Sequence, residues 1–190
     1  MPRISVKDYE NAEGRLRDIY EEIIEKRGKL ANIHTIQSLR PESIKKHMDL
    51  YMEIMFTSSP LKRWQREMMA VVVSNANKCL YCTLHHLEPL KHYIKDTDIT
   101  DRIVNYPEKP LDDPKNEALC HFAYTLTKSP GDHSKKDFTQ KLKENGFSDQ
   151  AILDAVLVVS YFNFVNRIVL SLDLQPSDKE ITGYKYEKSK

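Results

Sequence analysis

The amino-acid sequence predicts an all-α protein, and three observations lead to this prediction. Apolar residues recur at helical spacing in successive segments, and capping residues followed by proline mark several helix starts. No alternating run of apolar and polar residues is long enough to indicate a strand. A chain of 190 residues can bury a core as one domain. We therefore expect one domain over residues 1–190, with its core at residues 15–174 and a C-terminal tail at residues 175–190.

We expect about six to eight helices, each placed by its own start or stop signal. The starts are marked by Pro41, Ser59-Pro60, Asp113-Pro114, Ser134 and Ser148, with a further start near Cys79, and two stops are marked by Gly28 and Gly146. Pro89 lies inside the helix that starts near Cys79, where it is expected to kink the helix or end it early. Residues 95–112 are expected to form a connection with one short helix around Ile99 to Val104.

Charge and hydropathy restrict the class of protein. Lysine and arginine (29 residues) balance aspartate and glutamate (28 residues), so no broad field attracts nucleic acid or an anionic membrane. Residues 1–12 carry charges and no apolar stretch, unlike a secretory signal. The longest apolar region, residues 151–170, is interrupted by polar side chains, which indicates a helix at the centre of the fold or in a subunit interface. We expect a cytoplasmic protein, where a Cys-x-x-Cys pair is catalytic or metal-binding.

One neighbourhood gathers reactive side chains, namely Glu67, Cys79, Cys82 and His86. Cys82 and His86 are four residues apart on an expected helix, so their side chains share a face. Cys79 is close enough to Cys82 for a disulfide across the first turn, and the helix N-terminus favours a thiolate. An antiparallel hairpin with the preceding helix would bring Glu67 alongside, where its carboxylate can orient His86 or relay a proton.

Two other interpretations of these four residues stay open. Cys79, Cys82, His86 and Glu67 offer two sulfurs, one nitrogen and one oxygen to a Zn²⁺ ion. A structural zinc site, however, usually has a second, distant Cys/His pair, which this sequence lacks. Alternatively, the two cysteines only fill space between packed helices. We expect no metal and no organic cofactor in the catalytic cycle.

Several other polar or thiol residues need an assignment. His85 points about 100° away from His86 on a helix, so it is expected behind the site residues or at the surface. Cys120 lies among apolar residues and is expected to be a buried, inert thiol. Asn163, Asn166 and Arg167 interrupt an apolar helix and need partners. They border a pocket, make structural hydrogen bonds or lie in an interface.

The reactive residues also match a family signature. Glu67, Cys79, Cys82 and His86 have the Glu-x11-Cys-x2-Cys-x3-His spacing of alkylhydroperoxidase D (AhpD). The chain resembles the peroxidase-related branch of the carboxymuconolactone decarboxylase/AhpD superfamily. This similarity extends to the stretches Arg3–Val6, Arg66–Ser74 and Tyr161–Arg167, and it covers roughly residues 3–174.

The resemblance implies a helical AhpD-like fold that assembles into a homo-oligomer, such as a trimer or hexamer. It also implies that Cys82 attacks a hydroperoxide and becomes a sulfenic acid, which Cys79 resolves to a disulfide. His86 and Glu67 would form the proton relay that generates the thiolate and protonates the leaving alcohol or water. The implied partners are a hydroperoxide substrate and a dithiol reductant.

Two family features do not transfer to this sequence. The best-known AhpD members have a histidine immediately before the second cysteine, and here that position is Tyr81, which does not titrate near neutral pH. The lactone decarboxylases do not rely on the cysteine pair, so we do not predict a decarboxylase. We predict a thiol peroxidase that reduces organic hydroperoxides or hydrogen peroxide. The alternative is a redox-responsive or zinc-binding interaction protein without fast peroxidase turnover.

Overall fold

The computed structural model describes residues 2–108 and 111–181, and these residues form helices and connections only. The elements are α1 (Gly14–Arg27), α2 (Asn32–Thr35), α3 (Pro41–Phe56), α4 (Arg63–Ala76), α5 (Leu80–Tyr93), α6 (Thr97–Asn105), α7 (Pro114–Lys128), the 3-10 helix η1 (Pro130–Ser134), α8 (Thr139–Glu144), α9 (Asp149–Leu172) and α10 (Asp178–Ile181). Eight of these α-helices have six residues or more, and the described ranges contain no strand. The prediction of an all-α fold with six to eight helices is confirmed.

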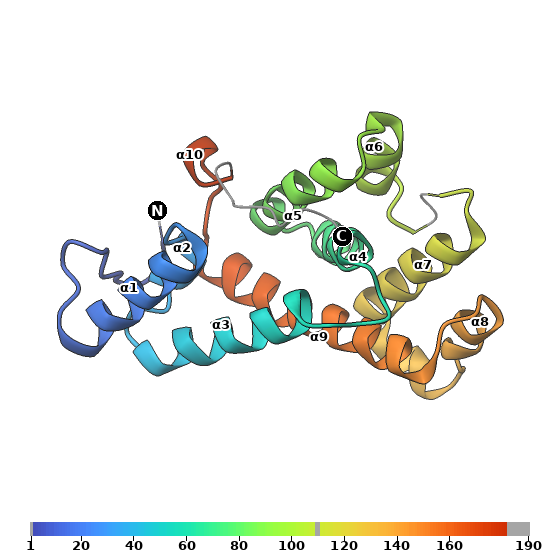
Figure 1. Cartoon of the computed structure of the whole chain (residues 1–190), viewed down its shortest axis with the longest axis horizontal. Helices are drawn as coiled ribbons and strands as arrows, with labels where there is room; N and C mark the ends of the chain where they lie inside the picture. Colours follow the sequence, from blue (N-terminus) through green and yellow to red (C-terminus); the bar gives the residue numbers. More distant parts are fainter. Residues whose placement is uncertain (1, 109–110, 182–190) are drawn as a thin grey trace.

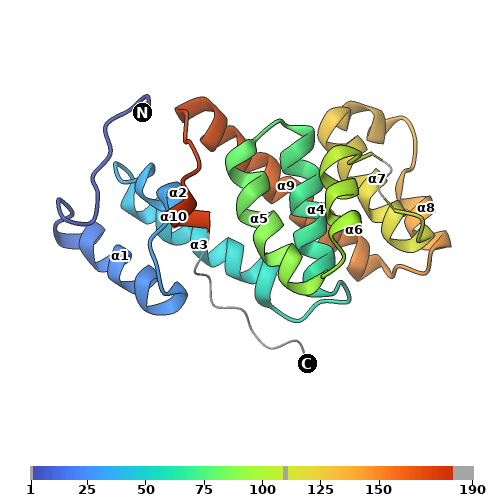
Figure 2. The same cartoon turned by 90° about the horizontal axis from the view of Figure 1, so that it is seen from above.

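Helix α4 is the most deeply buried element of the molecule. It packs against α5 on one side and against α7 and α9 on another, so that eleven of its 14 residues are buried. Figures 1 and 2 show α4 and α5 as an antiparallel pair in the middle, with α1 to α3 at one end and α6 to α8 at the other. The sequence indicated residues 151–170 as a central or interface segment. The corresponding helix α9 spans the molecule and contacts α3, α4, α5, α7 and α8.

Although α9 is apolar nearly all round, it is buried on only part of its surface. Leu153, Leu157, Phe164 and Leu170 are exposed, whereas ten other residues of the helix are buried. Among the described residues, α9 is also the helix long and apolar enough to cross a membrane by length and composition. Its contacts with five other helices are those of a core helix.

The N-terminal helices have a small core of their own. Residues of α1 and α3, with Ala12 of the preceding segment, form this cluster: Ala12, Leu16, Ile19, Tyr20, Ile23, Ile44 and Met48. The Tyr20 hydroxyl donates a hydrogen bond of 2.8 Å to the backbone carbonyl of Lys7, which holds the preceding segment against α1. Gly28 ends α1 with φ of 81°, a left-handed conformation that glycine adopts without strain. The cluster thereby fixes α1 and α3 as one wall facing α5.

Two predicted helix starts are confirmed in detail. Asp113 caps α7 by accepting hydrogen bonds from the backbone N–H groups of Lys115 and Asn116, with Pro114 as the first helical residue. Ser148 caps α9 by accepting a hydrogen bond from the Ala151 N–H at 3.2 Å. Both caps satisfy N–H groups that otherwise have no partner within the helix.

Other predicted boundaries were wrong by several residues. Helix α4 begins at Arg63, because Ser59 instead accepts from the Leu61 N–H and donates to Asp154 of α9. The helix expected from Ser134 begins at Thr139, where Asp137 accepts from the backbone N–H, and residues 130–134 form η1.

Two further predictions concern the end of α5 and the C-terminal tail. Pro89 does not end α5, which continues to Tyr93. The tail predicted at residues 175–190 contains α10, and the part from Thr182 onward lies outside the described residues.

The contribution of the Ser148 cap to stability can be tested by substitution. We expect Ser148→Ala to lower the free energy of unfolding by about 1 kcal/mol, because the Ala151 N–H at the start of α9 loses its acceptor. Urea unfolding followed by circular dichroism measures this difference. Ser160→Ala, at an exposed position within the same helix, is the matched control and is expected to cause no loss. Equal effects of the two variants would contradict the capping role.

Candidate active site

The turn between α4 and α5 places the predicted residues next to one another. Lys78 adopts φ of 58°, and the Cys79 N–H donates to the Ser74 carbonyl at 2.8 Å, which reverses the chain tightly. The side-chain amide of Asn77 donates to Asn163 and Asn166 of α9, each at 3.0 Å. The hairpin is therefore anchored to α9, and α5 returns alongside α4.

A buried carboxylate links the two helices of this hairpin. Glu67 on α4 is fully buried, and its Oε2 accepts a hydrogen bond of 2.7 Å from His86 Nδ1 on α5. Its Oε1 accepts from Arg63 Nε at 3.0 Å, one helical turn away. Burial raises the pKa of Glu67, but the positive charges of His86 and Arg63 outweigh burial and hold this pKa below its ordinary value. Because Nδ1–H donates to Glu67, Nε2 is the ring atom of His86 left to exchange a proton with another group.

The two cysteines lie at the start of α5, with Cys79 in the N-cap position. Both are reduced and buried, and their sulfurs share a hydrogen bond. This bond lowers the pKa of Cys79, with help from the backbone N–H of Cys82. The same bond, together with burial, raises the pKa of Cys82 well above its ordinary value, although the Asn166 amide acts in the opposite direction. The hydrogen bond between the two thiols therefore favours an anion on Cys79, at the N-terminus of α5.

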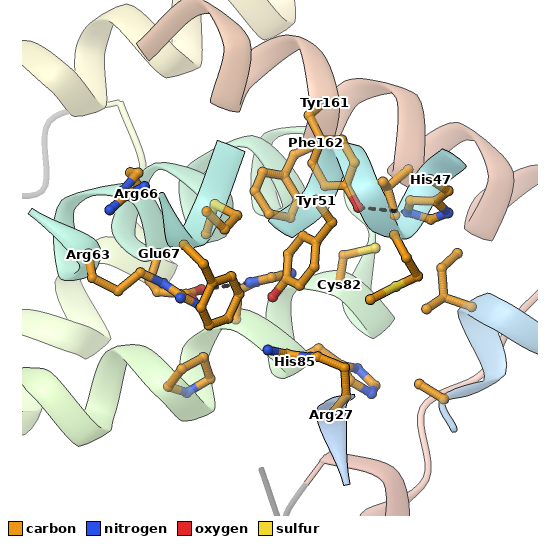
Figure 3. Close-up of a pocket in the computed structure, with 18 of the residues that line it drawn as sticks. Arg27, His47, Tyr51, Arg63, Arg66, Glu67, Cys82, His85, Tyr161 and Phe162 are labelled. Carbon is orange, nitrogen blue, oxygen red and sulfur yellow. Dashed lines mark hydrogen bonds and ion pairs between the residues drawn. The ribbon is translucent and has the colours of Figure 1, made fainter. Parts of the chain in front are cut away.

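A cavity of about 980 Å³ opens beside this pair. It is lined by Arg27, Lys29, Ala31, Ile33, His34, His47, Met48, Tyr51, Met55, Phe56, Lys62, Arg63, Trp64, Arg66, Glu67, Tyr81, Cys82, His85, His86, Pro89, Tyr93, Tyr161, Phe162 and Val165. Cys82 thus reaches the cavity wall, whereas Cys79 lies behind it. Figure 3 shows side chains converging on this space from α1, α3, α4, α5 and α9.

Residues that the sequence did not single out form the wall opposite Glu67. His47 Nε2 and the Tyr161 hydroxyl lie 2.6 Å apart, drawn as a dashed line in Figure 3, and Gln37 donates to His47 Nδ1 at 2.8 Å. The rings of Tyr51 and Tyr161 stack at 5.8 Å. The ring of Phe162 meets His86 edge-on at 4.4 Å. These rings come from α3, α5 and α9, so only the tertiary packing gathers them.

Tyr81 and His85 line the same cavity as Cys82 and His86, at the side of α5 that lies next to α10. Their rings stack at 4.1 Å, and the Tyr81 hydroxyl donates to the buried carboxylate of Glu180 in α10. Glu180 Oε1 also lies 3.6 Å from His85 Nε2 and accepts from the Asn32 N–H at 2.6 Å. His85 is buried and not at the surface, and it lies at the cavity wall next to Glu180 rather than behind the site.

The remaining predicted residues have separate environments. Cys120 is fully buried, and burial raises its pKa strongly. Asn166 is buried and donates to Ser74, so it supports the hairpin beside Cys82, while Asn163 donates to Thr127 at 3.1 Å. Arg167 is exposed and donates to the carbonyl of Asn163 on its own helix. Of the three polar residues in the apolar segment, only Asn166 acts on the cysteine pair.

No group of three or more His, Cys, Asp and Glu side chains in residues 2–108 and 111–181 is arranged to hold a metal ion. Glu67 instead directs its carboxylate to Arg63 and His86.

Comparison with known proteins identifies the fold. No protein-family model matches the sequence. The uncharacterized protein YdfG of Bacillus subtilis is 22% identical over 141 residues, which cover 74% of this chain and 94% of YdfG. An uncharacterized peroxidase-related protein from Silicibacter sp. TM1040 is 28% identical, with a TM-score of 0.76 over 87% of this chain and 86% of that protein. The chain has the AhpD-like fold.

Other AhpD-like structures extend the comparison. The AhpD core of a peroxidase-related protein from Ralstonia eutropha JMP134 superimposes with a TM-score of 0.82 at 24% identity, over 95% of this chain and 94% of that one. The debrominase Bmp8 shares the fold with a TM-score of 0.75 at 17% identity, over 95% of this chain and 98% of Bmp8. A cysteine-to-alanine variant of Bmp8 has been solved in complex with 2,3,4-tribromopyrrole. Proteins that share this fold therefore include a debrominase.

The buried histidines of the cavity wall make the protein sensitive to acid. Burial lowers the pKa of His34 to about 3 and that of His47 to about 4. The unfolded chain binds protons at its histidines below about pH 6.5, while the folded state leaves these two neutral until a lower pH is reached. The free energy of unfolding therefore decreases as the pH is lowered from about 6.5 towards the folded-state pKa values of these two histidines.

We expect His34→Asn to reduce this dependence, because the amide oxygen of asparagine can accept from the Ala31 N–H in place of Nδ1 and takes up no proton. Urea unfolding of both proteins from about pH 7 to pH 4 gives the difference in the free energy of unfolding. Relative to the variant, the wild type should lose stability progressively below about pH 6.5. A difference that stays constant with pH would contradict the neutral, buried state of His34.

Proposed function

We propose that this AhpD-like protein is a thiol peroxidase in which Cys82 and Cys79 are oxidised by a hydroperoxide. The observation that carries the proposal is the position of Cys82. Its sulfur lies at the wall of a cavity, hydrogen-bonded to Cys79 behind it, with the Glu67–His86 pair one helical turn along α5. A nucleophile, a resolving thiol and a buried base are thereby gathered at one point.

The reaction proceeds in two steps. The Cys82 sulfur attacks one peroxide oxygen, so that an S–O bond forms, the O–O bond breaks and the alcohol leaves after taking up a proton. The Cys79 sulfur then attacks the sulfenic acid, an S–S bond forms and water leaves. One hydroperoxide and two thiols give one alcohol, one water and one disulfide. A dithiol partner restores the two thiols by exchange.

Two observations bear on which sulfur attacks first. Because the sulfurs share a hydrogen bond, the first ionisation of the pair belongs to both residues, and transfer of one proton moves the anion between them. Cys79 holds the anion more easily, but Cys82 lines the cavity. A substrate can only react with the sulfur that it reaches, so access supports Cys82 as the nucleophile. His86, oriented by Glu67, then receives and returns the proton.

A second candidate reaction is the reductive dehalogenation of an aromatic compound. Tyr51, Tyr161 and Phe162 give the cavity aromatic walls, and the structural neighbour Bmp8 is a debrominase. In this reaction a cysteine takes the halogen from carbon, carbon takes up a proton, and the second cysteine displaces halide to form the disulfide. The same cysteine pair is oxidised, so the substrate distinguishes the two reactions.

The cytoplasmic location and the trimeric or hexameric assembly stay predictions.

The roles of the two cysteines can be separated by substitution. Reduced protein is mixed with one equivalent of an organic hydroperoxide, and the intact mass and peptide map are measured. Cys82→Ser should abolish the oxidation, because the remaining Cys79 does not reach the cavity. Cys79→Ser should still gain one oxygen at Cys82, trapped by dimedone, but form no disulfide. Cys120 is the internal control and should stay unmodified. Oxygen gained at Cys79 in the Cys82→Ser protein would reverse the assignment.

The proton relay is tested by rapid kinetics of the same oxidation. We expect His86→Gln and Glu67→Gln each to slow the formation of the disulfide by about 10²-fold or more, because the base or its orientation is lost. His92→Gln replaces an exposed histidine on the same helix outside the cavity and should leave the rate unchanged. Thermal unfolding of each variant controls for loss of the fold. Wild-type rates in both relay variants would exclude the relay.

A further inference from the structure

The cavity is much larger than a simple peroxide requires. Its volume of about 980 Å³ lies at the upper end of small-molecule sites, whereas one water-sized molecule occupies about 30 Å³. Its walls carry Met48, Met55, Tyr51 and Phe162, which offer an extended apolar surface. A substrate that filled this space would have a large apolar body.

The charged side chains that line the cavity are mostly basic. Five cations line it (Arg27, Lys29, Lys62, Arg63 and Arg66), against one carboxylate, that of Glu67. Most of the cations are engaged: Arg63 binds Glu67, Arg66 donates to the carbonyls of Ile54 and Thr57, and Lys29 donates to the carbonyl of Glu180. Lys62 is exposed to solvent.

Arg27 differs from these four cations. It is half-buried at the end of α1, and no carboxylate among the described residues forms an ion pair with it. Its guanidinium lies over the rings of Phe56 and Tyr51, at 4.6 Å and 5.4 Å from their centroids. Its Nη1 also lies 4.0 Å from the Met52 sulfur, a weak contact that leaves the other edge N–H groups available for a planar anion. Figure 3 shows Arg27 among the side chains around the cavity, with Glu67 and Cys82 in the same view.

We propose that the cavity binds amphipathic hydroperoxides that carry a carboxylate, with Arg27 as the residue that recognises the carboxylate. This inference rests on the proposed peroxidase function and names its substrate class. The apolar body would lie against the methionine and aromatic side chains, and the peroxide would reach Cys82. Because an anion at Arg27 would be bound before and after the reaction, Arg27 is a specificity-determining residue that takes no part in bond breaking.

Arg27 also has a simpler role, which the experiment must separate. A basic residue in the last turn of a helix stabilises the helix through its dipole, and both Lys26 and Arg27 occupy the last turn of α1. Lys26 is exposed and does not line this cavity. Lys26→Gln is therefore a matched control that removes the same charge from the same turn.

The first measurement compares two substrates that differ only in charge. A hydroperoxide of linoleic acid and its methyl ester are mixed with reduced protein below their micelle concentrations, and the rate of disulfide formation is measured. We expect kcat/KM to be about tenfold or more higher for the acid than for the ester, because a charge-assisted hydrogen bond is lost in the ester. Arg27→Gln should remove this preference, Arg27→Lys should keep part of it, and Lys26→Gln should keep all of it.

The second measurement does not depend on turnover. Trp64 is the one tryptophan of the sequence and lines the cavity, so its fluorescence reports binding. The hydroxy acid that corresponds to the reduced product, and its methyl ester, are titrated into reduced protein. Tighter binding of the acid, lost in Arg27→Gln, supports the proposal even if neither hydroperoxide oxidises the cysteines, in which case the peroxidase function alone fails.

Equal binding and equal rates for acid and ester in the wild type would overturn the proposed recognition while leaving a peroxidase in place. This comparison needs no variant, so it decides the question even if Arg27→Gln does not fold. A preference for the acid that survives in a folded Arg27→Gln protein would also overturn the role of Arg27.

Discussion

The buried carboxylate of Glu67 is the constraint on which the rest of the site depends. An unpaired charge in a protein interior is strongly unfavourable, so this side chain must have partners on at least two sides. Arg63 supplies one from the same helix, and His86 supplies the other from α5. Removing one partner of such a buried pair typically costs about 3–5 kcal/mol. The packing of α4 on α5 and the orientation of the imidazole are thus consequences of one interaction.

The same constraint extends from the hairpin to the cavity wall. Arg63 can hold Glu67 because its guanidinium lies over the ring of Phe56, at 3.6 Å from the centroid, where α3 ends. Phe56 in turn meets the ring of Tyr51 edge-on at 5.6 Å, and Arg27 of α1 lies over both rings. A chain of cation–π and aromatic contacts therefore connects the buried carboxylate to the N-terminal helices. Those helices form one side of a cavity that the α4–α5 hairpin alone would leave open.

The parts of the fold that the sequence predicted are those that local chemistry decides. Asp113 and Ser148 cap their helices because a short polar side chain at that position accepts from nearby N–H groups. Ser59 carries the same kind of signal, but its hydroxyl binds Asp154, 95 residues away, and the helix starts later. Pro89 fails as a stop because tertiary packing keeps α5 helical beyond it. Where a distant partner competes with a local one, the sequence pattern does not show which partner wins.

The same distinction applies to the candidate site, where some residues are brought together by local spacing and others by the packing of distant helices. Glu67, Cys79, Cys82 and His86 are found together because their spacing sets them on two adjacent turns of one hairpin. Arg63 also lies four residues before Glu67, and this spacing could have indicated the pair. His47, Tyr161 and Arg27 belong to three different helices, and their meeting depends on how α1, α3 and α9 pack. Hydrophobic periodicity predicts which face of a helix is buried but not which helix covers it.

The tyrosine that replaces the family's histidine before the second cysteine has a definite place in this arrangement. Helix α5 carries two pairs of side chains at a spacing of four residues, Cys82 with His86 and Tyr81 with His85. Each pair meets a buried glutamate, but His86 meets Glu67 of α4, whereas Tyr81 donates to Glu180 of α10. Burial raises the pKa of Glu180, and the hydrogen bonds from His85 and Tyr81 outweigh this and lower it, so this carboxylate also stays ionised.

Position 81 is therefore occupied with holding the segment after α9 against α5. A tyrosine does this better than a residue that titrates near neutral pH, because its hydroxyl keeps donating to Glu180 across that range. Under the proposed peroxidase function, the proton that leaves the cysteine pair would pass to His86, which Glu67 orients. Helix α5 thus carries two neighbouring pairs with different partners: Tyr81 and His85 hold the segment after α9 in place, and His86, held by Glu67, lines the cavity with Cys82.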